Sequence, residues 1–142
     1  MTYSTPPPPP PPQTADTRLG TIKTYILIAW IFSIIIMVVW LLAAVSLILS
    51  YLAIAATLGA FGQYYAGFYA FGLIEGIIFL IFMIPAFLVF RRVGKMHKAV
   101  NAGDIATLKA TSNMMWAIIA LIFAGVIPGI MLLIADGPIK QL

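Results

Sequence analysis

"YILIAWIFSIIIMVVWLLAAVSLILSYLAIAAT", residues 25–57, is a run of 33 residues that contains no charge, no glycine and no proline. A helix needs only about 20 apolar residues to cross the hydrocarbon core of a bilayer. Two crossings would require a turn inside the run, and no residue there favours one. The run therefore predicts one long helix that is tilted or extends beyond the membrane. A tight hairpin within residues 25–60 is the alternative.

The composition indicates that the chain as a whole is a membrane protein. Of its 142 residues, 63% are hydrophobic and only 8% are charged, whereas a soluble domain has about 25% charged residues. A globule of this size has too much surface for its volume to bury so much apolar area. We predict an all-α integral membrane protein with three transmembrane helices, at about 25–57, 70–90 and 114–134.

The second predicted helix, residues 70–90, follows the glycine-rich and aromatic segment "LGAFGQYYAGFYAFG". Glycines interrupt helices, and tyrosine and phenylalanine are typical of the membrane interface. The segment predicts a short loop at the membrane surface. Pro85 lies inside the helix and predicts a kink there.

Residues 91–113 are the one sizeable hydrophilic segment, and we predict that they form a basic loop. Asp104 precedes a short helical pattern, and its side chain is expected to cap the free amides of that helix. Ser112 or Asn113 is expected to cap the third transmembrane helix in the same way. Trp116 is expected to anchor that helix at the interface.

Pro128 is expected to bend the third helix, and it leaves the position of the C-terminus open. If residues 114–134 cross the membrane, the C-terminus lies outside. If Pro128 and Gly129 form a re-entrant turn, it lies inside.

The distribution of lysine and arginine predicts the orientation. Arg18 and Lys23 precede the first helix, and five further basic residues lie within 91–113. Cytoplasmic segments of membrane proteins carry an excess of these residues. We therefore expect a multi-pass protein of the cell membrane whose N-terminus and segment 91–113 are cytoplasmic.

The N-terminal residues 1–22 are predicted to be a disordered tail that precedes a single helical membrane domain, residues 23–142. Seven consecutive prolines at 6–12 favour an extended polyproline II conformation. Such a tract serves as a stiff spacer. The alternative is a docking site for a polyproline-binding partner.

Glu75 is the only charged residue between Lys23 and Arg91. A carboxylate is costly in a membrane, and such residues commonly mark ion, proton or assembly sites. Its expected partners at a similar depth are the hydroxyls of Ser46 and Ser50. The alternative is that Glu75 reaches the outer interface, since it lies only about five residues inside the helix.

Two pairs of glycines, Gly72 with Gly76 and Gly125 with Gly129, have the four-residue spacing that lets membrane helices approach closely. We expect these four residues to mediate helix packing. The first pair flanks Glu75, which suggests that the carboxylate lies beside a helix contact.

Five cations are candidates for contact with lipid headgroups: Arg91, Arg92, Lys95, Lys98 and Lys109. A basic residue near an anionic membrane surface contributes about 1 kcal/mol to binding. The alternative is that these residues only determine topology. The net charge of +4 does not predict a nucleic-acid partner.

The residues needed for enzymatic chemistry are not grouped in the sequence. The chain has no cysteine, and its one histidine, His97, has only Asp104 as a nearby acid. A metal site or a nucleophilic site needs several such groups together. We therefore expect no enzyme activity, no metal and no cofactor.

The segment "MHKAVNAGDIATLKATSNMMWAII", residues 96–119, resembles the loop of the dispanin, or interferon-induced transmembrane, superfamily. The likeness covers about residues 91–134 and lies in the basic residues before Gly103 and Asp104, the alanines and serine that follow, and Trp116. A proline-rich N-terminal tail also occurs in that group. The chain lacks the cysteines that are palmitoylated in the family, and its first helix is longer. The resemblance implies a small membrane protein that acts by assembly or by influencing the bilayer.

Together these features predict a non-enzymatic integral membrane protein that acts by self-assembly or as a subunit of a membrane complex. The lipid bilayer and a homo-oligomer or complex partner are the expected interactions. The alternative is a small channel or transporter subunit that uses Glu75 as its polar membrane site.

Overall fold

The computed structural model describes residues 15–58, 62 and 66–142 of the chain. Helices account for almost all of this part, and no strand occurs within it. The elements are α1 (Ala15–Leu58), α2 (Ala66–Ala102), α3 (Ile105–Thr111), α4 (Met114–Ile119), the π-helix η2 (Ala120–Ala124) and α5 (Val126–Lys140). The predicted all-helical fold is confirmed. The proline tract lies outside the described residues.

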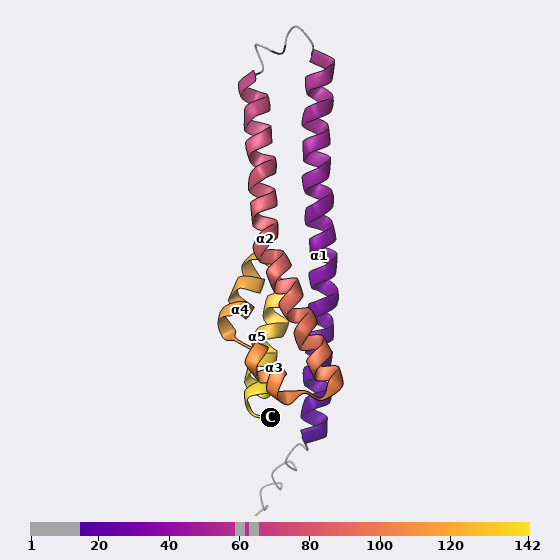
Figure 1. Cartoon of the computed structure of the whole chain (residues 1–142), viewed down its shortest axis with the longest axis vertical. Helices are drawn as coiled ribbons and strands as arrows, with labels where there is room; N and C mark the ends of the chain where they lie inside the picture. The colour runs from indigo at the N-terminus through magenta and orange to yellow at the C-terminus, as the bar shows by residue number, and fades with distance from the viewer. Residues whose placement is uncertain (1–14, 59–61, 63–65) are drawn as a thin grey trace, which may run out of the picture.

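Helices α1 and α2 are antiparallel and form a long hairpin (Figure 1). They contain 44 and 37 residues, so they measure about 65 and 55 Å at a rise of about 1.5 Å per residue. Both are long and apolar enough to cross a membrane, and α3 with Met114–Ala124 is a third candidate if this pair, bent by 61°, is one span. Helix α2 also changes direction part-way along its length (Figure 1), as expected for a helix that contains Pro85.

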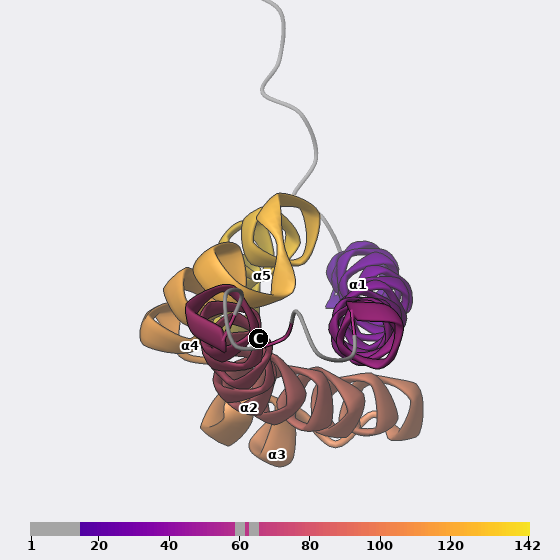
Figure 2. The same cartoon turned by 90° about the horizontal axis from the view of Figure 1, so that it is seen from above.

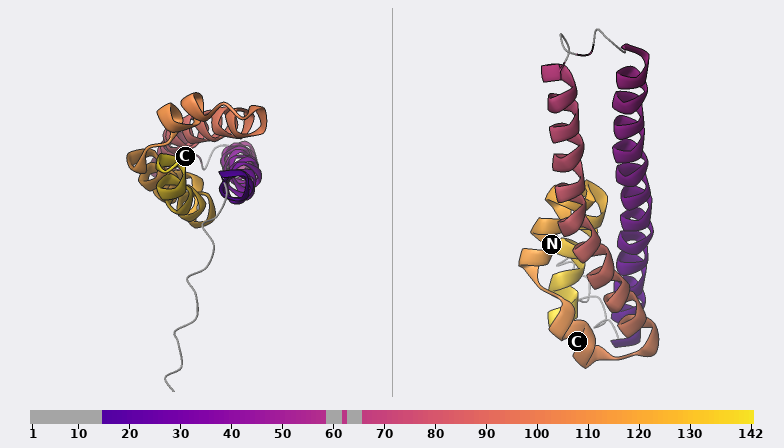
Figure 3. Two further views of the ribbon diagram at one scale, coloured as in Figure 1. Left: turned by 90° about the horizontal axis from the view of Figure 1, so that it is seen from below. Right: turned by 45° about the horizontal axis from the view of Figure 1, so that its top comes forward.

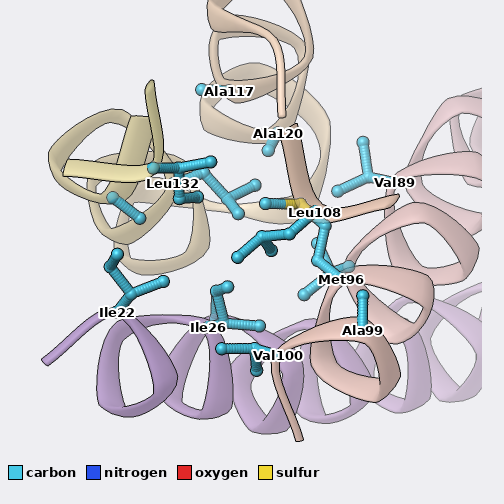
Figure 4. Close-up of a cluster of buried hydrophobic side chains, with 14 of the residues drawn as sticks. Ile22, Ile26, Val89, Met96, Ala99, Val100, Leu108, Ala117, Ala120 and Leu132 are labelled. Atoms are coloured by element: carbon cyan, nitrogen blue, oxygen red, sulfur yellow. The ribbon is translucent and has the colours of Figure 1, made fainter. Parts of the chain in front are cut away.

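One face of the first turns of α1 is covered by protein, while Leu27 and Ile31 on the rest of this part are 37% and 43% exposed. Ile22, Ile26 and Ala29 are 0% exposed and belong to a core that also contains residues of α2, α3 and α5 (Figure 4). Farther along α1, apolar side chains such as Ile35 and Leu42 are exposed. The run is therefore longer than a membrane crossing because its beginning packs into a core. Residues 15–22, predicted as part of the tail, are the first turns of α1, and Ile22 explains why they are ordered as helix.

The predicted loop at 91–113 is wrong for its first half, because α2 continues through Ala102. Buried residues recur along this part of the helix at Val93, Met96 and Val100. This spacing of three to four residues places them on one face, which packs against the core. Helix α2 therefore begins and ends beyond the predicted bounds of 70–90.

The rest of the segment that was predicted as a loop consists of a short connection and the helix α3. Gly103 has a φ of 69°, which ends α2, and Asp104 caps α3 by accepting a hydrogen bond from the amide of Thr107 at 3.0 Å. Asn113 caps α4 by accepting from the amide of Met115 at 2.9 Å. Both predicted caps are confirmed, with Asn113 rather than Ser112 as the cap of α4.

The predicted continuous helix at 114–134 is broken at Gly125. This residue has φ 104° and ψ 163°, a conformation essentially restricted to glycine. The chain turns there, and α5 runs back beside α4 and η2 to Lys140, so the tail is helical as well (Figures 1 and 3). We call α4, η2 and α5 the short hairpin.

The four glycines predicted for helix packing all act within the chain. A Cβ on Gly129 would lie 2.4 Å from the Cα of Leu121, so the two arms of the short hairpin meet at backbone contact. In the long hairpin, a Cβ on Gly72 would lie 2.2 Å from the ring of Tyr51, and one on Gly76 would lie 3.3 Å from Ile48. The predicted close approach therefore joins α1 to α2.

The short hairpin covers only one half of the long hairpin. A Cβ on Gly125, at its tip, would lie 2.3 Å from Ile36, and the ring of Phe123 lies 5.6 Å from that of Phe82. Beyond this level α1 and α2 contact only each other among the described elements (Figure 1). Viewed along its length, the covered half is a bundle of α1, α2, α4 and α5 (Figure 2).

We predict that Gly125→Ala destabilises the fold, because any Cβ at this φ is strained and would also collide with Ile36. The cost should be on the order of 1–3 kcal/mol, measured as a lower midpoint of thermal unfolding in detergent. Gly137→Ala is the matched control, since nothing lies within 4 Å of a Cβ there and alanine favours a helix. A Gly125→Ala protein as stable as the control would contradict the turn.

Candidate functional site

All eight lysine and arginine residues lie at one end of the molecule, which consists of residues 17–33, 91–112 and 131–142. We call this part the basic end. It contains the beginning of α1, the end of α2, all of α3 and the end of α5 (Figure 1). Lys140, predicted on the far side if the third helix crossed, joins the others because α5 returns.

Exposed cations begin on α2 where its exposed apolar surface ends. Phe87 and Leu88 are exposed, and Arg91, Lys95 and Lys98 follow as exposed basic residues. Their spacing of four and three residues places them along one face of the helix. This stripe lies where a membrane-embedded helix would meet the lipid headgroups. Lys109, on α3, is also exposed.

Arg92 differs from Arg91, Lys95 and Lys98 because it is partly buried and hydrogen-bonded within the chain. Its Nε donates a hydrogen bond to the carbonyl of Thr111 at 2.9 Å. Its guanidinium carbon lies 4.8 Å from the centre of the Trp116 ring, a cation–π contact. Arg92 therefore ties α2 to the connection between α3 and α4.

A hollow of about 370 Å³ lies between α1 and α2 on one side of the stripe. Its lining includes Trp30, Phe90, His97 and the three cations Arg91, Lys95 and Lys98. A second hollow of about 320 Å³ lies on the other side, and Arg91, Arg92, Lys95, Thr111 and Trp116 line it together with Leu88 and Ala110. Four of the five predicted headgroup residues thus line a hollow.

His97 forms an aromatic wall of the hollow between α1 and α2. Its ring stacks on that of Trp30, with centroids 4.7 Å apart and planes 5° apart. The amide nitrogen of Asn101 lies 3.1 Å from its Nε2. In the described part of the chain Nδ1 is buried and has no partner.

The predicted grouping of Glu75 with Ser46 and Ser50 is not formed. Glu75 is half-buried beside Gly76, and no described residue forms a hydrogen bond with its carboxylate. Ser46 and Ser50 are exposed on α1, where the Ser50 hydroxyl donates to the Ser46 carbonyl at 2.7 Å. They line a groove of about 370 Å³ with Tyr51 and Phe68, and Glu75 is not part of that lining.

Asp136 is a polar residue that the sequence analysis missed. It is 7% exposed and accepts hydrogen bonds from the Ser112 hydroxyl at 2.6 Å and from the Lys140 ammonium at 2.5 Å. These bonds join the base of the short hairpin, because Ser112 precedes α4 and Asp136 lies near the end of α5. The four-residue spacing of Asp136 and Lys140 is the available signal, although Gly137 and Pro138 between them favour a turn.

The environment of Asp136 acts on its pKa in two opposing ways. Burial raises the pKa, because it disfavours the charged carboxylate. The hydrogen bonds from Lys140 and Ser112 and the charge of Lys140 lower it, and the net result is a pKa below the ordinary value. The carboxylate is therefore ionised in the folded protein at neutral pH.

The chain was compared with protein-family models, curated proteins and solved structures, and none of them matched. The resemblance of residues 91–134 to the dispanin superfamily therefore stays a prediction. In the part of the chain that the structure describes, no group of three His, Asp or Glu residues could hold a metal ion.

We predict that acid destabilises the basic end through Asp136. Because its folded-state pKa is lowered, the stabilisation is complete above the ordinary value of about 3.9 and is lost as the pH falls through the folded-state value. Asp136→Asn should cost about 1–3 kcal/mol at pH 7 by removing the charged acceptor. The variant should also lose less stability than the original protein as the pH falls below about 4. Thermal unfolding followed from pH 7 to pH 3 measures both effects.

Asp104→Asn is the matched control for this experiment. It makes the same chemical change at an exposed cap, where asparagine caps a helix as well as aspartate does. Equal losses at pH 7 for the two variants would show that the buried contacts of Asp136 contribute nothing specific.

Proposed function

We propose that the long hairpin crosses the bilayer twice and that the short hairpin enters from the basic end and turns back at Gly125. The length of the entering arm supports this arrangement. Helix α4 has six residues and η2 has five, so the arm measures about 16 Å at about 1.5 Å per residue. That is about half of the hydrocarbon core, which is about 30 Å thick.

The tip of the short hairpin is compatible with this depth. Non-helical backbone inside a membrane is tolerated only where protein covers it or its polar groups find partners. The carbonyl of Gly125 accepts a hydrogen bond from the amide of Gly129 at 3.2 Å, and Ile36 lies against Gly125. Val126 and Ile127, which follow, are exposed and apolar, so they suit contact with lipid.

The gathering of all eight basic residues at one end supports a cytoplasmic basic end in the cell membrane. In this orientation the beginning of α1, the α2–α3 connection and the C-terminus lie on the cytoplasmic side. The C-terminus then follows the re-entrant alternative, with the turn at Gly125 rather than at Pro128.

We propose that this non-enzymatic membrane protein acts on the bilayer itself, as a wedge that occupies more area in the leaflet on its basic side. The single observation that carries this proposal is the contact of Gly125 with Ile36, which ends the short hairpin half-way along the long one. Four helical segments then fill one leaflet and two fill the other. A leaflet that accommodates the wider part is favoured where it forms the convex face of a curved membrane.

We predict that the reconstituted protein concentrates in narrow tubes pulled from giant vesicles when its basic end faces the outside of the tube. The wide part of the wedge then lies in the expanded leaflet. The measurement is the fluorescence ratio of labelled protein to a lipid dye in the tube relative to the vesicle. Protein inserted with its basic end inside should be depleted from the tube.

Orientation and depth serve as the control for this experiment. The chain has no cysteine, so single cysteines placed at Lys98, Val126 and Phe68 can each carry one label. An impermeant quencher added outside should quench a label at position 98. It should not reach a label at position 126, which lies in the middle of the bilayer, or a label at position 68, which lies on the far side. An equal ratio in tubes for both orientations would contradict the wedge.

Self-assembly is a second proposal, and an exposed stripe of small residues on α1 favours it. Ala43, Ser46, Ser50 and Ala53 recur every three or four residues and are all exposed. Small residues allow membrane helices to approach closely, and hydroxyls can bond between helices. The pair Gly72 and Gly76 is already used within the chain, so this stripe is the better surface for a second copy. A channel that uses Glu75 has less support, because Ser46 and Ser50 do not join the carboxylate.

We predict that the double variant Ser46→Ile with Ser50→Ile weakens a dimer, because isoleucine blocks close approach and removes both hydroxyls. The dissociation constant should rise about threefold or more, since one interhelical hydrogen bond contributes about 0.6 kcal/mol. Native mass spectrometry over a dilution series measures it. Ala55→Ile is the control, because Ala55 is exposed and lies two residues after Ala53 and five after Ser50, which places it on another side of α1. Equal dissociation constants for the original protein, the double variant and the control would show that the stripe is not the assembly surface.

A further inference from the structure

The hollow between α1 and α2 lies at the depth of the lipid headgroups in the proposed orientation, so the inference drawn from it rests on that orientation. Phe90 belongs to its lining, and the exposed Phe87 and Leu88 precede it on α2. On its other side the lining ends with Lys98. The hollow therefore extends from the apolar surface of α2 into the row of cations.

The three cations of the hollow have no carboxylate paired with them. In the described part of the chain the one salt bridge joins Lys140 to Asp136. Asp104 lines a neighbouring groove with Lys95 and Lys98, but its carboxylate binds the amide of Thr107 and forms no salt bridge with either lysine. Arg91, Lys95 and Lys98 thus present an uncompensated positive charge to the hollow.

Trp30 contributes a rigid wall and a donor to the same hollow. Stacking on His97 holds its ring. A Cβ on Gly94 would lie 3.6 Å from its Nε1, so a side chain larger than alanine at position 94 would crowd this wall. No described residue accepts a hydrogen bond from this Nε1. The indole N–H is therefore available beside the cations.

We propose that this hollow binds the phosphate headgroup of an anionic phospholipid in the leaflet at the basic end. Arginine and lysine supply charge-assisted hydrogen bonds to phosphate oxygens, and Trp30 supplies a neutral donor. The volume of about 370 Å³ lies within the range of small-ligand sites. A lipid is favoured over free phosphate because Phe87 and Phe90 continue the site toward the membrane, where acyl chains would lie.

The test titrates the detergent-solubilised full-length protein with short-chain phosphatidic acid and counts bound lipid by native mass spectrometry. We expect one tightly bound lipid per chain. Lys95→Gln should weaken binding about fivefold, the effect of removing one cation close to a phosphate. Trp30→Phe keeps the ring, removes the donor and should also weaken binding. Short-chain phosphatidylcholine, which has no net charge, should bind more weakly than phosphatidic acid.

Lys109→Gln is the matched control, because it removes the same charge from an exposed position of the basic end that does not line the hollow. It should leave the affinity within about twofold of the original. Equal losses for the two lysine variants would mean diffuse charge attraction and would overturn the proposal. So would displacement of the lipid by an equal concentration of inorganic phosphate, or equal binding of phosphatidylcholine.

The proposal for the orientation and the proposal for the lipid site can be rejected separately. If a label at position 98 reports the middle of the bilayer, the proposed orientation fails and the lipid site fails with it. If the label reports the headgroup region and Lys95→Gln still binds phosphatidic acid normally, only the hollow is rejected.

Discussion

The fold depends on how the apolar surface of α1 is covered along a helix longer than the membrane is thick. Lipid can cover about 20 residues of such a helix, and the rest must pack against protein or face water. Ile22, Ile26 and Ala29 are covered by protein at the basic end, where they share a core with residues of α2, α3 and α5. The extension of α2 past Arg91 and the return of α5 both follow from this need, since each contributes residues to that core.

Polar contacts at the basic end hold the covering elements in place. Arg92 joins α2 to the end of α3, and Asp136 joins the base of the short hairpin through Ser112 and Lys140. Both side chains are partly or largely buried, so their partners offset the cost of removing charge from water. Arg92 is bound inside the protein, so Arg91, Lys95 and Lys98 are the cations that face outward beside the hollow.

The two halves of the molecule differ in width for the same reason. Gly125 turns the chain back half-way, so α4 and α5 widen the half that contains the core, while α1 and α2 continue alone. In that narrower half, close approach at Gly72 and Gly76 replaces the missing core. The proposed wedge shape, headgroup site and orientation are connected, because each of these proposals places the wide, basic half of the protein in one leaflet.

The sequence by itself determined the all-helical class, the two apolar helices that are long enough to cross a membrane, the caps at Asp104 and Asn113, and the glycines at which other elements approach closely. These features depend on composition and on neighbours within a few residues. It left open a turn at Pro128 and Gly129 but predicted Gly125, where the chain turns, only as a packing residue. It also predicted a loop where α2 continues, because Val93 and Met96 are helical only together with the core they bury. Asp136 was missed because Gly137 and Pro138 beside it favour a turn and its partner Ser112 lies 24 residues away in the sequence. Only the tertiary structure decided which helix faces each glycine and which polar groups find partners, since those contacts join residues far apart along the chain.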